Sequence, residues 1–310
     1  MHCSLVRRTL AGLKCSSYSY TLQTMKNKCL IVLALLLASL GATAQRRVED
    51  SVTLADGTRH FKMFLPSGLK KDAPLLFVLH GYTGHAGWPR SLSDAAEKYG
   101  FALCAPQGYK APKGATGWNV GYPKQEGWKQ DDVKSICQLA RVVQKRYNLS
   151  RRNTFITGMS NGGDICYLLA YSNQRTFRAM FSVAGLTLSW IPERYTMKRR
   201  VPFVEIHGTE DRVSEWDGDP VNKGGWGAYL GVEDAVNRIA EVDGCQLADS
   251  VEMESIAGSK GHKIVKYRYA NPHTDTEVWL YRVIGAPHCW HDRDVNIGEE
   301  EWKFFRRYLR

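Results

Sequence analysis

The sequence predicts a mostly parallel twisted β-sheet with helices on both faces and antiparallel strands at its N-terminal edge. Short, continuous apolar runs alternate with helix-like segments through the middle of the chain, a pattern typical of parallel sheets buried on both sides. Residues 51–65 instead alternate apolar and polar side chains around a turn at Asp56-Gly57, which indicates a hairpin. Functional side chains in such sheets follow the carboxyl ends of the strands, so a site is expected there.

The composition is that of an ordinary globular protein. The chain has 310 residues, 44% of them hydrophobic and 24% charged, and its formal net charge is +11. These values exclude a mostly disordered chain, a collagen-like repeat and a polytopic membrane protein. The cationic side chains are scattered along the sequence, which argues against a nucleic-acid-binding protein and favours a mildly basic, solvated surface.

Residues 1–44 have the features of a leader followed by a secretory signal peptide. Two lysines precede an apolar run at 30–40, and a small-residue cleavage pattern ends at Ala44. The apolar run is too short to span a bilayer, so no stable membrane anchor is expected. We therefore expect translation to start at Met25 and cleavage to release a secreted or periplasmic chain, 45–310, that forms a single domain.

The strands and helices follow two patterns along the mature chain. Continuous or alternating apolar runs predict strands at 74–79, 101–104, 154–157, 179–183, 202–206, 265–269 and 278–284. Apolar residues at helical spacing predict helices near 91–99, 131–147, 161–171, 232–240 and 302–309, the last with Trp302, Phe305 and Leu309 on one face. Asp131 and Asp132 suit the positive end of a helix dipole, and we favour that role over catalysis.

A candidate nucleophile stands where the strand at 154–157 turns into the next helix. Gly158-Met159-Ser160-Asn161-Gly162 is a G-x-S-x-G motif in the strand–turn–helix context that this motif requires. A sharp turn there exposes the Ser160 hydroxyl, and the N–H of Asn161 at the helix N-terminus points to where an oxyanion would develop. The alternative is a glycine-rich helix entry with Ser160 as its N-cap.

A nucleophilic serine needs a base and an orienting acid, in the chain order Ser, acid, His for this kind of sheet. Asp211 lies in the loop after the strand at 202–206 and is the expected acid; its rivals are Glu210, Asp217 and Asp219. His288 follows the strand at 278–284 and is the expected base, and its first rival is His291. His262 and His273 are weaker rivals, because they precede strands and so belong at the wrong end of the sheet or on its flank.

Three further features surround the predicted catalytic residues. His80-Gly81-Tyr82 follows the strand at 74–79, so the Tyr82 N–H is the expected second oxyanion donor, with His80 holding the loop. Aromatic side chains in loops beside these residues suit a flat phenolic group or a sugar ring, or else pack the loops. The candidates for substrate binding are Trp88, Trp118 and Trp290.

Five cysteines follow the expected cleavage site, an odd number that leaves at least one free thiol in an exported protein. Cys104, Cys137 and Cys166 lie in apolar runs and are expected to be buried free thiols. Cys245 and Cys289 either pair or stay free. Because no C-x-x-C spacing occurs and the cluster at 288–292 has no matching second cluster, no metal is expected, and no organic cofactor is needed.

Six segments taken together resemble the polyhydroxybutyrate depolymerase / feruloyl esterase group of α/β-hydrolases, which is related to carbohydrate esterase family one. In chain order they are Leu79-His80-Gly81-Tyr82, Gly117-Trp118-Asn119, Asp131-Asp132-Val133, Gly158 to Gly163, His207 to Val213, and Gly285 to Trp290. The resemblance covers about residues 48–308. Two departures stand out, since Trp290 is followed by His291-Asp292 where the group has Pro-Gly, and the strand near Tyr269 lacks the cysteine that many members pair with the one at Cys245.

The resemblance implies an α/β-hydrolase fold and a secreted serine esterase without a large lid, using Ser160, Asp211 and His288. Its expected substrates are feruloyl or acetyl esters on plant polysaccharide, and no nucleic acid partner is implied. The alternatives within enzymes are a polyhydroxyalkanoate depolymerase or a peptidase on the same fold. The alternative from another class is a non-catalytic glycan-binding protein that keeps the fold.

Overall fold

The computed structural model describes residues 44–111 and 114–310. The leader and signal peptide expected at 1–44 lie, apart from the last residue, outside the described residues. Gln45–Arg310 forms one compact unit. Within the described residues, no helix is both long enough and apolar enough to cross a bilayer.

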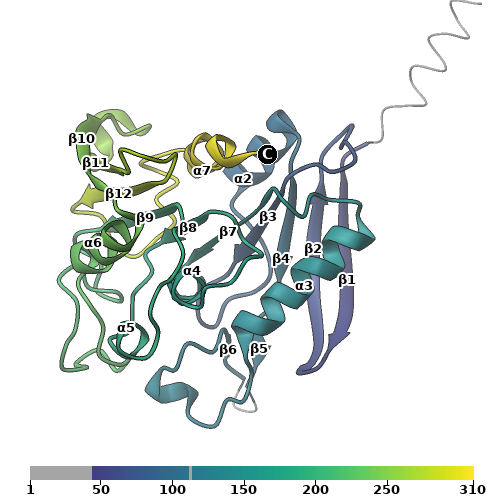
Figure 1. The fold of residues 1–310 in the computed structure, drawn as a ribbon, viewed down its shortest axis with the longest axis horizontal. Coiled ribbons are helices and arrows are strands. Elements are labelled where there is room, and N and C mark those ends of the chain that lie inside the picture. Colours follow the sequence, from purple (N-terminus) through teal and green to yellow (C-terminus); the bar gives the residue numbers. More distant parts are fainter. Residues whose placement is uncertain (1–43, 112–113) are drawn as a thin grey trace, which may run out of the picture. The chain divides into compact units, whose positions relative to one another are not determined.

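Ten strands form one sheet in the order β1-β2-β4-β3-β7-β8-β9-β12-β11-β10 (Figure 1). The strands from β4 to β12 in this order run parallel, while β1 and β2 at one edge and β10 and β11 at the other are antiparallel. Their bounds are β1 Arg46–Leu54, β2 Gly57–Leu65, β3 Leu75–Leu79, β4 Ala102–Pro106, β7 Thr154–Met159, β8 Met180–Val183, β9 Phe203–Gly208, β10 Gln246–Met253, β11 Lys263–Ala270 and β12 Glu277–Ile284. A separate short ribbon pairs β5 Tyr109–Lys110 with β6 Thr116–Gly117.

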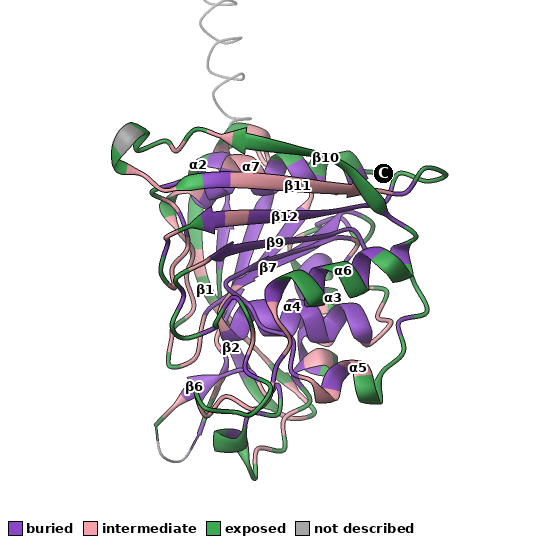
Figure 2. Ribbon diagram, turned by 90° about the vertical axis from the view of Figure 1, so that its left-hand side faces the viewer, coloured by how far each residue is buried: buried purple, intermediate pink, exposed green. Residues whose placement is uncertain are grey.

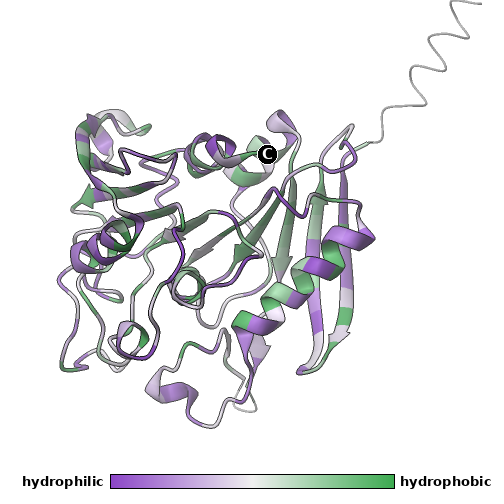
Figure 3. Ribbon diagram, in the orientation of Figure 1, coloured by the Kyte–Doolittle hydropathy of each residue, from purple (hydrophilic) through white to green (hydrophobic). Residues whose placement is uncertain are grey.

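Helices cover both faces of the sheet, as the sequence predicts. One hydrophobic cluster joins the sheet to α3, α4 and α6, and a second joins the opposite face to α2 and α7. The helices are α2 Arg90–Tyr99, α3 Asp132–Arg146, α4 Asn161–Tyr171, α5 Trp190–Arg194, α6 Val232–Asp243 and α7 Ile297–Phe305, with short 3-10 turns at Pro123–Gln125, Gly258–Lys260 and Arg306–Tyr308. The central strands are hydrophobic along their length, whereas β1 and β2 are mixed (Figure 3), because only the central strands are buried on both faces.

The structure differs from the sequence prediction at several places. The strand β7 continues through Gly158 to Met159 instead of ending at Gly158. Leu309 lies beyond α7 and is 40% exposed, so it is not part of the buried face. The strand β10 was not expected; it lies at the sheet edge with nearly all its residues exposed (Figure 2), so it carries no apolar signal.

Asp131 and Asp132 both lie at the N-terminus of α3, as expected, but their side chains have different partners. Asp131 is the N-cap of α3 and accepts a hydrogen bond from the Lys134 N–H at 3.0 Å, as suits a helix N-terminus. Asp132 is instead buried, 2.8 Å from the Arg59 guanidinium on β2, and it accepts the N–H of Asn119 at 2.6 Å. This carboxylate therefore joins the first hairpin, α3 and the loop at Asn119, away from any predicted catalytic residue.

Candidate active site

Ser160 occupies a strained turn between β7 and α4. Its backbone has φ 56° and ψ −123°, a combination that non-glycine residues rarely adopt. Its N–H donates to the carbonyl of Val183 at the end of β8, with a length of 2.8 Å. A Cβ on Gly162 would lie 2.5 Å from the Leu79 carbonyl oxygen, so only glycine lets α4 approach β3 this closely. The Ser160 residue is half-buried, which leaves it within reach of a ligand.

Asp211 and His288 meet across the ends of two neighbouring parallel strands. Asp211 follows β9 and His288 follows β12, and the His288 Nδ1 and Asp211 Oδ2 atoms are 2.6 Å apart. The other carboxylate oxygen of Asp211 accepts the N–H groups of Val213 and Ser214, both at 2.8 Å. Because Asp211 occupies Nδ1, the ring nitrogen left for proton transfer is Nε2 of His288. Both residues lie at the strand-end edge that also carries Ser160.

Among the described residues, Ser160 Oγ makes no hydrogen bond to His288, whereas His288 contacts Asp211 directly. The serine lies at the end of β7, two strands from β9 and three from β12 in the sheet order. The structure therefore brings the three predicted catalytic residues to one edge of the sheet. It joins two of them directly.

A buried charged cluster lies beneath Asp211. The His207 ring places Nδ1 2.9 Å from Glu205 and Nε2 2.7 Å from the Ser214 carbonyl and 3.4 Å from Asp211. Burial disfavours a charged ring, but hydrogen bonds with Asp211 and Glu205 raise the pKa of His207 to about 10. Burial likewise opposes ionisation of Asp211, yet hydrogen bonds from His207 and His288 hold its pKa well below the usual range. Asp211 is therefore a carboxylate at neutral pH, and His207 an imidazolium.

The loop after β3 lies against the serine. A Cβ on Gly81 would be 3.2 Å from the Ser160 Cβ, so the loop backbone reaches Ser160. The N–H of Tyr82 makes no hydrogen bond to any described residue, and the N–H of Asn161, in the first turn of α4, has no partner within its helix. Both N–H groups lie in segments next to Ser160 and stay the candidates for an oxyanion hole.

His80 holds this loop, as expected from the sequence. Its Nε2 accepts the N–H of Gly108 at 2.9 Å, so the proton sits on Nδ1 and is donated to the Gly81 carbonyl at 2.7 Å. Burial lowers the pKa of His80, which keeps the ring neutral. Gln107 contacts the same ring at 3.0 Å and was missed in the sequence because no motif marks it.

The three predicted substrate-binding tryptophans occupy different environments. Trp118 is 1% exposed; its indole N–H donates to the His80 carbonyl, and its backbone is held on both sides by the Asn161 side chain. Trp88 packs at the edge of the sheet against Phe64, with the Arg47 guanidinium 6.0 Å from its ring. Trp290 is half-buried beside His288 in the same loop. Trp290 packs with part of its surface against the second hydrophobic cluster and stays a candidate for substrate binding, whereas Trp118 builds the framework.

An aromatic group that the sequence did not single out adjoins the oxyanion loop. The Tyr82 ring contacts those of Tyr122, Trp128 and Trp226, with centroids 5.6–6.3 Å apart, and the Lys124 ammonium lies 3.2 Å from the Trp226 ring. Tyr122 in turn donates to the buried carboxyl of Asp164 on α4. Burial raises the pKa of Asp164 to about 7. The rings come from segments far apart in the sequence, so no local pattern connects them.

The rival residues have other partners. His262 lies beside the His288 loop, so of its two expected positions, the wrong end of the sheet and its flank, the first is excluded. The reason is that β11 runs antiparallel to β12 and so begins where β12 ends. Its Nδ1 is 2.9 Å from Asp294. His291 is buried, and burial lowers its pKa to about 4. The remaining acids are either exposed, as Glu210 and Asp217 are, or bonded within their own loop, as Asp219 is to the N–H of Gly224.

All five described cysteines are free thiols. Cys104 and Cys166 are buried as expected, whereas Cys137 is half-buried. Cys245 donates to the Thr276 carbonyl near the start of β12, while Cys289 follows its far end. A strand of eight residues separates them, about 26 Å at the usual rise, so the pairing considered for these two does not occur.

Comparison with known proteins identifies the family. Residues 51–246 match the model of the Esterase family, which is described as "Putative esterase". The chain belongs to this esterase family.

Relatives of the esterase include proteins named as feruloyl esterases and as an acetylxylan esterase. "Probable feruloyl esterase C" of Aspergillus niger is 28% identical over 218 residues, which cover 68% of this chain and 73% of that protein. A bifunctional acetylxylan esterase/xylanase of Neocallimastix patriciarum is 25% identical over 165 residues, which cover 50% of this chain but 22% of that protein. The chain thus spans about a fifth of the bifunctional enzyme.

Solved structures share the fold of the esterase. An acetyl xylan esterase from Aspergillus awamori matches with a TM-score of 0.59 and 16% identity, covering 84% of this chain and 99% of that one. An S-formylglutathione hydrolase from Agrobacterium tumefaciens matches with a TM-score of 0.53 and 12% identity, covering 87% and 100%. The esterase therefore has the predicted α/β-hydrolase fold. The family match and the feruloyl esterase relatives show that it is a carboxylic ester hydrolase of the feruloyl esterase group.

Proposed function

We propose that the esterase uses Ser160 as nucleophile, His288 as general base and Asp211 as the carboxylate that orients the imidazole. The observation that carries this proposal is the 2.6 Å contact between His288 Nδ1 and Asp211 at the strand-end edge where Ser160 stands in its strained turn. The contact fixes the ring tautomer and stabilises the imidazolium that forms when the serine loses its proton.

The reaction then follows from the geometry. His288 Nε2 takes the proton of Ser160 Oγ, which attacks the ester carbonyl, and the N–H groups of Tyr82 and Asn161 stabilise the oxyanion. His288 returns the proton to the leaving alcohol, and an acyl group remains on Ser160. Water, activated by the same histidine, hydrolyses this acyl-enzyme and releases the acid. Each step uses groups of this chain and water.

The proposed substrates are feruloyl or acetyl esters carried by plant polysaccharide. The names of the relatives support this class, and so does the half-exposed position of Ser160, which a polymer-linked ester can reach. Trp290, two residues after His288, and Tyr82, in the loop beside Ser160, both have half-buried rings that suit a flat acyl group or a sugar. A polysaccharide outside the cell requires an exported enzyme, in agreement with the signal peptide expected at 1–44.

The proposal is tested by hydrolysis of methyl ferulate and p-nitrophenyl acetate with the wild type, Ser160→Ala and His262→Asn. We expect Ser160→Ala to lose about 10⁴-fold or more of kcat on both esters. His262→Asn removes a neighbouring histidine that faces Asp294 and is expected to keep wild-type activity within about threefold. Undiminished hydrolysis by Ser160→Ala would overturn the catalytic assignment. Activity on the acetate alone would keep it and favour an acetyl ester over a feruloyl ester.

A further inference from the structure

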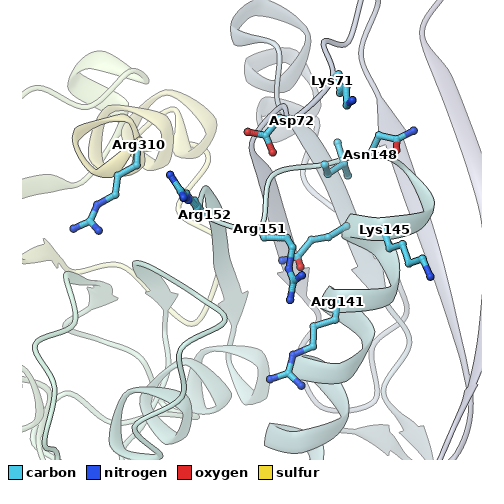
Figure 4. A pocket seen from close by; sticks show the side chains of 10 residues that line it. Lys71, Asp72, Arg141, Lys145, Asn148, Arg151, Arg152 and Arg310 are labelled. Carbon is cyan, nitrogen blue, oxygen red and sulfur yellow. The ribbon is translucent and has the colours of Figure 1, made fainter.

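Two adjoining hollows lie at the amino-terminal ends of the central strands. Each has a volume of about 650 Å³, and they share Arg151, Arg152 and Arg310 in their linings. Figure 4 shows these arginines around one hollow, together with Lys145 and Arg141 from α3. Seven arginines and a single carboxylate, Asp275, line the other hollow. The two hollows therefore form one continuous, strongly cationic surface, called here the arginine surface.

The arginines reach this surface from separate loops that the fold brings together. Arg151 and Arg152 precede β7, Arg175 and Arg178 precede β8, and Arg199 and Arg200 precede β9. These three strands are parallel neighbours in the sheet. Their amino-terminal ends therefore meet at one edge and carry the arginine pairs with them. Cations that look scattered along the sequence are thus concentrated on one surface, contrary to the even basic surface expected from the sequence.

Arg310 is fixed beside the first of these pairs. The Asn153 side chain accepts the Arg310 N–H at 2.8 Å and donates to the Arg310 carbonyl at 2.9 Å. The end of the described chain is therefore held against the loop that carries Arg151 and Arg152.

These cations have no acidic partners, unlike others in the protein. Arg59, Arg146, Arg268 and Arg307 each form a salt bridge, whereas none of the seven arginines lining the hollow does so with any described residue. The Nε atom of Arg178 is buried and has no hydrogen-bond partner there. Burial and the neighbouring Arg310 lower the pKa of Arg178. An uncompensated cluster of guanidinium groups is unfavourable by itself, and an anionic ligand would relieve it.

We propose that the arginine surface binds an acidic polysaccharide through the carboxylates of its uronate units. A guanidinium group can form two parallel hydrogen bonds with one carboxylate. Every cation that lines the hollow containing Asp275 is an arginine rather than a lysine. Several carboxylates spaced along a polymer can each meet one of the arginine pairs. The choice of a polysaccharide rests on the proposed function, whereas the anionic character of the ligand rests on the arginine surface alone.

The surroundings favour a polysaccharide over a nucleic acid or a membrane. The apolar residues that line the hollows, including Leu149, Phe177 and Tyr308, are themselves buried. They offer no exposed ring on which a base could stack and no apolar side chain that could enter a bilayer. A concave cationic surface without such groups suits a hydrophilic polyanion.

The arginine surface is remote from the proposed catalytic residues. It lies before β7, whereas Ser160 follows that strand, and six residues separate the two ends, about 20 Å at the usual rise. A polymer bound there leaves the ester site open. Binding is therefore expected to hold the enzyme on an acidic polymer without changing kcat on a small soluble ester.

The test measures binding of fluorescein-labelled polygalacturonate by fluorescence anisotropy, with neutral dextran as the reference polymer. The variant is Arg152→Gln/Arg175→Gln/Arg200→Gln, which removes one exposed arginine from each pair. Its matched control, Arg46→Gln/Lys110→Gln/Lys134→Gln, removes three exposed cations outside the hollows. We expect wild type to prefer polygalacturonate over dextran, the variant to lose roughly tenfold or more in affinity, and the control roughly threefold or less.

Three outcomes would overturn the proposal: equal binding of polygalacturonate and dextran by wild type, equal losses in variant and control, or preferential binding of phosphatidylglycerol vesicles through these arginines. Hydrolysis of p-nitrophenyl acetate by the same proteins shows that each is folded, and it also separates the two proposals. A protein that hydrolyses the ester but ignores polygalacturonate contradicts only the arginine surface. A protein that binds polygalacturonate but fails to hydrolyse the ester contradicts only the catalytic assignment. Should the triple variant unfold, Arg152→Gln alone is measured by the same criteria.

Discussion

Single residues beneath the proposed site determine its electrostatics. His207 and Asp211 are both buried, and each stabilises the charged form of the other at 3.4 Å. The Glu205 carboxylate lies 2.9 Å from the other ring nitrogen of His207, Nδ1. An imidazolium next to Asp211 keeps this carboxylate ionised, so in the proposed reaction the proton moves between Ser160 and His288. The segment 207–211 thus contributes a buried cation, His207, as well as the acid expected at Asp211.

The buried His207 leads to a prediction about stability and pH. Its pKa is about 10 in the fold against an ordinary value of 6.5, so the stability that its charge contributes is complete below about pH 6.5 and is lost as pH rises through about 10. We expect His207→Gln, which leaves Glu205 and Asp211 without the cation, to be less stable by about 3–5 kcal/mol at pH 6. The difference from wild type should shrink towards pH 10.

Urea unfolding at pH 6, 8 and 10 measures this difference. The exposed His60 supplies the control, because His60→Gln should follow the wild type at every pH. A constant gap between wild type and His207→Gln across the three pH values would show that His207 is not charged in the fold.

Residue roles were predictable from the sequence where a motif fixes the backbone, and less so where burial decides. The strained turn at Ser160 follows from its glycines, since the close approach of α4 requires them, while the catalytic role of Ser160 stays a prediction. Trp118 looks like a ligand-binding ring in the sequence, because residue type alone does not say which way an indole faces. His262 was expected at the wrong end of the sheet or on its flank, because the rule for strand ends assumes a parallel strand, and β11 is antiparallel.

At the scale of elements, the close contact of α4 with β3 and β7 sets the position of the nucleophile. A Cβ on Gly158 would overlap the backbone of Gly162, so this position also requires glycine. The N-terminal turn of α4 can therefore approach the strand ends closely enough for Ser160 and Asn161 to stand above the sheet. The same turn carries Asp164, which accepts the N–H of Leu186 at 2.8 Å and holds the helix to the loop after β8.

We expect Gly162→Ala to lose both stability and activity. Its Cβ would lie 2.5 Å from the Leu79 carbonyl oxygen, a backbone atom that cannot turn aside. Moving α4 away costs about 1–3 kcal/mol by analogy with other overpacked sites, and it displaces Ser160 and the Asn161 N–H. Thermal unfolding and hydrolysis of p-nitrophenyl acetate measure the two effects.

Gly87→Ala is the matched control for this substitution. Gly87 has its nearest neighbouring atom 3.9 Å from the added Cβ, so this variant should resemble the wild type in both measurements. Equal behaviour of Gly162→Ala and Gly87→Ala would mean that the tight contact does not position the serine.

Elements were predictable in proportion to their burial. The central strands are apolar on both faces, so their sequences show continuous runs that give their positions to within a few residues. The edge strand β10 is exposed along nearly its whole length, and its polar residues look like a loop. It pairs with β11 through backbone hydrogen bonds, which leave no trace in the side-chain pattern.

At the scale of the whole molecule, chemistry and charge are divided between the two ends of the sheet. The carboxyl ends of β7, β9 and β12 lead to Ser160, Asp211 and His288, and the amino ends of β7, β8 and β9 present the arginine surface. A parallel sheet produces this division directly, because every loop before a strand lies at one edge and every loop after it at the other. An enzyme built this way can hold a polymer at one end and cleave its esters at the other.

The same division predicts how the protein responds to salt. Like charges on the arginine surface repel one another in the fold more than in the unfolded chain, where they are farther apart. Ions shorten the range of this repulsion to about 10 Å at 0.1 M and less above it. We expect the wild-type Tm to rise by about 2–4 °C between 10 and 300 mM NaCl, which corresponds to about 1 kcal/mol for a domain of this size.

Comparison with the charge variants assigns this effect to its source. Arg152→Gln/Arg175→Gln/Arg200→Gln should start from a higher Tm at low salt and gain less on salt addition, because part of the repulsion is already gone. Arg46→Gln/Lys110→Gln/Lys134→Gln has the same net charge but keeps the arginine surface, so its response should follow the wild type. If both variants respond alike, the repulsion comes from net charge rather than from the arginines gathered at the amino ends of β7, β8 and β9. Salt-dependent stability thus tests the clustering of charge in the folded protein independently of any ligand.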